Sequence, residues 1–132
     1  MKDNAALAVG WVRKAESDLA DARRTANSDG PYDTACFHAQ QAVEKYLKAL
    51  LAWQGIPIPR THDLEELQRL CQPLIPMDAF SGLNVAELSG YAVELRYDAE
   101  FWPDLDTAVA ALAIADTVRA LVLGLLPVET TR

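Results

Sequence analysis

One segment of the sequence places four hydrogen-bonding side chains at helical spacing: His38, Gln41, Lys45 and Lys48. Steps of three, four and three residues put them on one face of a helix that is otherwise largely apolar. Two ammonium groups, an amide and an imidazole suit phosphate oxygens and the edges of bases. The pattern therefore predicts a ligand-binding stripe. The alternative is a solvated helix face on which Glu44 pairs with Lys48.

A second candidate group stands at the end of a later helical segment, where Tyr97 follows Arg96. A guanidinium fork suits a phosphate or an RNA backbone, so both residues join the candidate ligand-binding set. The alternative is that Arg96 only compensates the helix dipole in the last turn.

His62 lies where a loop leads into a helix, in the run Thr61-His62-Asp63-Leu64. It could act as a general base, although no orienting partner stands near it in the sequence, and local packing or hydrogen bonding is the alternative. The chain has two histidines, and neither has a second His or Cys at metal-ligand spacing. Phosphate-binding and dinucleotide-binding glycine motifs are also absent. We therefore expect no metal and no cofactor.

Charge and composition narrow the range of partners. The 132 residues are 51% hydrophobic and 23% charged, which is typical of one globular domain and excludes a disordered chain. Twelve basic against nineteen acidic residues give a net charge of −7, so binding to duplex DNA is not expected. All four lysines lie in the first 60 residues, so an anion site should draw on that half.

The sequence also favours a cytoplasmic protein without a membrane span. Cys36 and Cys71 are too few for a disulfide framework and are expected to be reduced thiols. The first residues show no signal-peptide pattern. An apolar run over 107–126 is interrupted by Asp116 and Arg119, which would be costly in lipid. We interpret the run as a helix of the bundle.

Helical periodicity runs through nearly the whole chain, with no convincing strand. The expected helices cover residues 5–27, 32–54, 63–71, 79–96 and 105–126, with Asp104 as the N-cap of the last. In the first of them, the apolar line should begin with Leu7 and Trp11. Breaks marked by Gly and Pro separate the helices. The prediction is an all-α fold, a single domain over 1–132 built as an antiparallel helical bundle.

These residues resemble the HEPN domain family (higher eukaryotes and prokaryotes nucleotide-binding). The resemblance rests on WVRKAESDL at 11–19, HAQQAVEKYLKALL at 38–51, THDL at 61–64 and ELRY at 94–97. It implies an up-and-down bundle of four main helices plus a short fifth, usually a homodimer. It also implies a nucleotide or RNA as ligand, and a minimal nucleotidyltransferase as the partner protein in a toxin–antitoxin pair.

The chain departs from the ribonuclease members of that family at one motif. Those members carry an arginine and a histidine with four to six residues between them, but Phe101, Trp102 and Pro103 stand at the corresponding positions after Arg96. None of these can transfer a proton. We therefore expect a non-catalytic module. The alternatives are a divergent metal-independent ribonuclease that uses Arg96 with His62 or His38, and a pure interaction module without a ligand.

Two further expectations concern surfaces. Apolar surface on the first, second and last helices should form the dimer contact. Phe101 and Trp102 are expected to pack as a hydrophobic staple on the last helix or to form a subunit contact, rather than to stack on a base.

Overall fold

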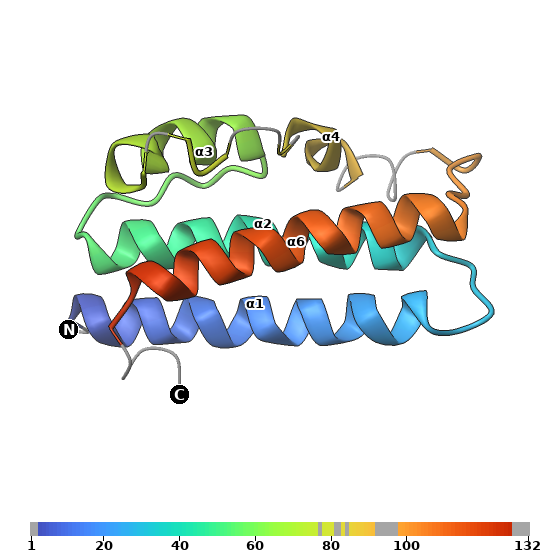
Figure 1. Cartoon of the computed structure of the whole chain (residues 1–132), viewed down its shortest axis with the longest axis horizontal. Coiled ribbons are helices and arrows are strands. Elements are labelled where there is room, and N and C mark those ends of the chain that lie inside the picture. The colour runs from blue at the N-terminus through green and yellow to red at the C-terminus, as the bar shows by residue number, and fades with distance from the viewer. Residues whose placement is uncertain (1–2, 77, 81–82, 84, 92–97, 128–132) are drawn as a thin grey trace.

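The computed structural model describes residues 3–76, 78–80, 83, 85–91 and 98–127, and every helix in this part of the chain belongs to one bundle. Helix α1 (Asn4–Ala26) and helix α2 (Asp33–Trp53) form an antiparallel pair. The chain then returns along the bundle through α3 and α4, and α6 (Leu105–Leu125) completes the fourth pass (Figure 1). The described residues contain no strand, and the all-α bundle is confirmed.

Helix α1 begins at a capped end and buries a line of small residues. The Asp3 side chain accepts a hydrogen bond of 2.8 Å from the Ala6 amide and so caps the helix. The buried apolar line is Ala8, Val12, Ala15, Leu19 and Ala22. The expectation that it begins with Leu7 and Trp11 was wrong, because Leu7 is 40% exposed and the first two buried positions are Ala8 and Val12.

Helix α2 is the centre of the bundle and packs against α1, α3, α4 and α6. Tyr46, Leu47, Leu50 and Leu51 are almost fully buried, as is typical of a helix with neighbours on several sides. Gly55 ends the helix at a φ of +72°, and the Ile56 amide donates to the Leu51 carbonyl. This is a Schellman ending, and it requires the left-handed conformation that glycine adopts readily.

The third pass is broken into short pieces. Helix α3 (Leu64–Cys71) is capped by Asp63 and continues into a 3₁₀ turn, Gln72–Leu74. The helix expected to begin at residue 79 begins later, because Ala79 lies in a turn and α4 covers only Ala86–Ser89. Residues 92–96 of the expected helix lie outside the described residues.

Helix α6 lies against α2 and is tied to α1 by two ion pairs. It is long and apolar enough to cross a membrane by length and composition alone, and 33% of its most apolar window is buried. Asp116 accepts from Arg23 at 2.7 Å, and Arg119 donates to Glu16 at 2.9 Å. Both charges within its apolar run are thus paired with α1, which supports its interpretation as a helix of the bundle.

The end of α2 gives a direct test of the fold. We expect Gly55→Ala to lower the free energy of unfolding by about 1–2 kcal/mol, because alanine is strained at positive φ. Its Cβ would also lie 3.1 Å from the Asn4 side chain. Gly10→Ala is the control: nothing lies within 4 Å of a Cβ in the middle of α1, so a gain of up to about 1 kcal/mol is expected. Urea denaturation measures both, and equal effects would contradict the Schellman ending.

Candidate functional site

Two buried carboxylates organise the polar side chains of α2. Asp18, on α1, is 9% exposed and accepts hydrogen bonds from the Lys45 ammonium and from His38 Nδ1, the latter at 2.9 Å. A carboxylate removed from water needs opposite charge and hydrogen bonds. Asp18 thus joins α1 to α2 through two of the residues that the sequence placed in the ligand-binding stripe.

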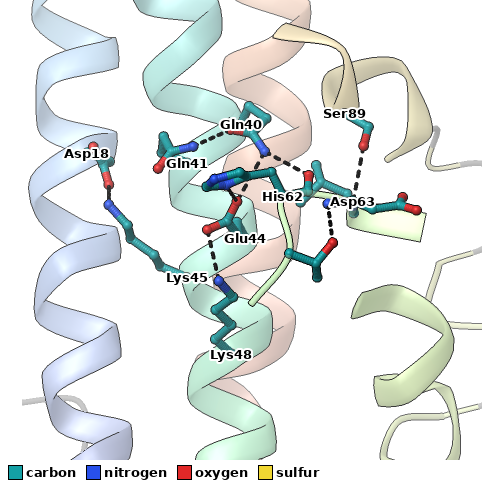
Figure 2. Close-up of polar contacts among 11 residues, drawn as sticks. Asp18, Gln40, Gln41, Glu44, Lys45, Lys48, His62, Asp63 and Ser89 are labelled. Atoms are coloured by element: carbon teal, nitrogen blue, oxygen red, sulfur yellow. Dashed lines mark hydrogen bonds and ion pairs between the residues drawn. The ribbon is translucent and has the colours of Figure 1, made fainter. Parts of the chain in front are cut away.

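The second carboxylate is Glu44, on α2, which is only 3% exposed. It accepts from Lys48 Nζ at 3.1 Å and from His62 Nδ1 at 2.7 Å. The buried Gln40 amide adds a longer contact of 3.4 Å. Glu44 therefore holds the loop before α3 against α2 (Figure 2).

Gln40 and Gln41 form a chain of hydrogen bonds that belongs to the Glu44 group. The Gln40 amide nitrogen donates to the His62 carbonyl at 3.3 Å, so its carbonyl oxygen is left to accept. The Gln41 amide nitrogen fills that position at 2.6 Å. Gln41 lies between the Asp18 side and the Glu44 side of α2 in Figure 2.

The loop that carries His62 is fixed by hydrogen bonds of the residues on both sides of the histidine. The Asp63 amide donates to the Thr61 hydroxyl at 3.0 Å, and the Asp63 side chain caps α3. The Leu64 amide donates to the Ser89 hydroxyl at 3.1 Å, which ties the loop to α4. The His62 ring thus rests on an ordered backbone while its side chain remains 57% exposed.

The solvated-face interpretation is wrong for the Glu44–Lys48 pair, although the pair itself is confirmed. Its side chains are 3% and 8% exposed, so it is a buried ion pair. The Lys48 ammonium also lies 5.3 Å from the centre of the Trp11 ring, a cation–π contact. Lys45 likewise forms an ion pair with Asp18. Both lysines that were expected to bind phosphate are therefore already neutralised by carboxylates.

The structure brings together most, but not all, of the predicted residues. His38 and Lys45 lie in the Asp18 group, and Gln41 and Lys48 lie in the Glu44 group beside it on α2; the two groups together are called the α2 network. Arg96 and Tyr97 fall outside the described residues. Sequence reasoning missed Asp18 and Gln40. An acidic residue next to the buried Leu19 on the inward side of α1 was the signal that could have identified Asp18.

Other candidates have structural roles. Cys36 and Cys71 are buried thiols that form no disulfide, and burial raises the pKa of Cys71 to about 12, which disfavours the reactive thiolate. No group of three potential metal ligands occurs in the described part of the chain. Phe101 packs on Tyr91 with ring centres 5.5 Å apart, but Trp102 is 63% exposed, so the staple interpretation is wrong for Trp102.

The bundle and its α2 network define an all-α protein with a polar face on its second helix. Comparison with known families extends this, because the family model described as HEPN domain matches residues 8–125. The chain therefore belongs to the HEPN domain family. Searches of curated proteins and of solved structures found no match.

Asp18 gives the site a defined pH dependence. Burial opposes its ionisation, but the hydrogen bonds from His38 and Lys45 outweigh burial and hold the pKa below its usual 3.8. A carboxylate whose pKa is lower in the folded state stabilises the fold above its unfolded pKa. This stability is lost as the pH falls through the folded pKa.

We therefore expect Asp18→Asn to be about 1–3 kcal/mol less stable at neutral pH and to lose less stability in acid than the wild type. Urea denaturation at about pH 7 and about pH 3 measures this. Asp21→Asn, one turn further along α1 at an exposed position, should cost less than about 0.5 kcal/mol. An unchanged acid dependence in Asp18→Asn would contradict the role of Asp18.

Proposed function

We propose that this chain is a non-catalytic HEPN module that binds a nucleotide or short RNA, a minimal nucleotidyltransferase partner, or both, as one member of a toxin–antitoxin pair. The observation that carries the proposal is the ordered polar network on α2. Its imidazole and amide groups are held in fixed orientations by buried neighbours, which lowers the ordering cost of binding a small ligand.

The proposed binding residues are His38, Gln41, Lys45, Lys48, Arg96 and Tyr97. Lys45 and Lys48 would act as the neutralised partners of Asp18 and Glu44 rather than as free phosphate ligands. Gln41 is the best placed of the described ones, because its amide is oriented by Gln40. Buried reduced cysteines support a cytoplasmic location. The absence of a histidine at 101–103 supports binding without cleavage.

Calorimetry with ATP tests the binding proposal. Gln41→Ala should weaken ATP about five- to tenfold, because one oriented hydrogen bond contributes on the order of 1 kcal/mol. Gln68→Ala, the same substitution on α3, should leave the affinity unchanged. If the wild type binds neither ATP nor a short RNA, the ligand-binding part of the proposal is wrong, and only binding to a partner protein remains.

A second candidate function, metal-independent RNA cleavage, is favoured by one observation. His62 contacts the buried Glu44 through Nδ1, which is how a general base is oriented by a carboxylate. His62, or His38 on Asp18, would have to act with Arg96.

A cleavage assay without added metal separates the two functions. We expect no cleavage by the wild-type protein, because no histidine follows Arg96 at the family's spacing. Cleavage that is lost in both Arg96→Ala and His62→Ala would establish the ribonuclease and overturn the non-catalytic proposal.

The proposed homodimer should use the beginning of α6. Among the described residues, the exposed large apolar side chains are Leu7, Trp102, Leu105 and Val109, and three of these four lie at or just before the start of α6. The apolar side chains of α2 are mostly inside the bundle. The contact is therefore proposed for α6, with α1 beside it.

Light scattering tests this surface. The wild type should be a dimer, and Val109→Glu should be a monomer, because a buried unpaired charge is costly at an apolar contact. Gln68→Glu adds the same charge on α3 and should remain dimeric. A wild-type monomer, or a dimeric Val109→Glu, would reject α6 as the contact.

A further inference from the structure

The polar network on α2 has a chemical character that the sequence pattern did not suggest. We propose that it recognises the ribose hydroxyls of a nucleoside, rather than a phosphate. This inference rests on the proposed function, because it names which part of a nucleotide or RNA the same residues contact. The inference depends on which atoms of the network have no hydrogen-bond partner within the protein and can therefore bind a ligand.

The cations of the network are already paired. Lys45 contacts Asp18, and Lys48 contacts Glu44 at 3.1 Å with only 8% of its side chain exposed. Two positive and two negative side chains cancel. A phosphate at this position would have to separate an ammonium from a buried carboxylate, which would leave that carboxylate without its counter-charge.

The histidines, in contrast, present acceptors. A carboxylate only accepts hydrogen bonds, so the contacts of Asp18 with His38 Nδ1 and of Glu44 with His62 Nδ1 place the proton on Nδ1. In the neutral ring, Nε2 then carries a lone pair. No contact to either Nε2 is made by the residues that the structure describes, and His62 is 57% exposed.

Gln41 adds a third acceptor between the two rings. Its amide nitrogen donates to Gln40, whose own orientation is fixed by its bond to the His62 carbonyl. The carbonyl oxygen of Gln41 is therefore left for a ligand. Gln41 is three residues from Glu44, which holds His62, or about 4.5 Å along the helix at ~1.5 Å per residue, so two neighbouring hydroxyls can reach both acceptors. His38 lies three residues to the other side of Gln41 and extends the site toward the rest of the nucleoside.

Three acceptors stand beside lysines whose charge is already neutralised by Asp18 and Glu44. This combination favours an uncharged ligand that donates hydrogen bonds and can also accept from the remaining lysine N–H groups. A ribose offers two neighbouring hydroxyls that rotate to donate and carry no competing charge. The edge of a base is less suitable. Besides its amino group, it carries ring nitrogens that accept hydrogen bonds, and these would face the protein's own acceptors with no donor between them. The 2′-hydroxyl also separates RNA from DNA, so the network should favour ribose over deoxyribose.

Calorimetry with a set of related ligands tests the inference. Adenosine should bind within about threefold of ATP, and 2′,3′-dideoxyadenosine at least about tenfold more weakly than adenosine, since two hydrogen bonds are lost. Inorganic pyrophosphate should not compete with adenosine. ATP affinity should change less than about threefold between 50 and 300 mM salt, because few charges are neutralised on binding.

His62→Ala tests the assignment to this network. It should weaken adenosine at least about fivefold and reduce the preference for adenosine over the dideoxy compound, whereas Gln68→Ala should change neither. Three results would overturn the inference: binding of ATP but not adenosine, competition by pyrophosphate, or an unchanged ribose preference in His62→Ala. Absence of binding by adenosine, ATP and short RNA alike would remove ligand binding itself, and this inference with it.

Discussion

Two carboxylates, Asp18 and Glu44, are taken out of water inside a helical bundle, and the polar architecture depends on satisfying them. A buried carboxylate without counter-charge is strongly destabilising. Asp18 meets this requirement through α2, and Glu44 meets it through its own helix and the loop before α3. The same contacts that neutralise these groups also set the register of α1 on α2 and the position of His62.

This constraint also determines what the polar face can bind. Lysines on a helix face ordinarily suggest an anion site, but here each lysine is matched by a carboxylate. With the lysine charges neutralised, three acceptors keep unused capacity: two imidazole nitrogens and one amide oxygen. Membership of the HEPN domain family makes a nucleotide or RNA a natural ligand to test, and the network indicates which end of it would be recognised.

Much of the fold could be predicted from periodicity and from chain breaks. Capping residues and the glycine at 55 located the ends of α1, α2, α3 and α6 within one or two residues. The buried face of α1 was predicted incorrectly in its first turns. Leu7 and Ala8 are both apolar, so the sequence does not show which of them is buried; in the packed bundle it is Ala8. The late start of α4 was missed because residues 78–80 form a turn.

The site was predictable only where its contacts are local. The Glu44–Lys48 pair lies within one helix turn, so spacing identified it, but spacing could not show that it is buried. The contacts of Asp18 with Lys45 and of Glu44 with His62 span 27 and 18 residues. Such contacts depend on how the helices pack, which a single sequence does not reveal.

The most direct test is the tautomeric state of the two histidines, measured by long-range ¹H–¹⁵N NMR on uniformly labelled protein at neutral pH. We expect His38 and His62 both to carry the proton on Nδ1, with Nε2 unprotonated. Glu44→Gln should change the pattern of His62 and leave that of His38 intact. Protonation of the neutral rings at Nε2 instead would contradict the orienting role of both carboxylates.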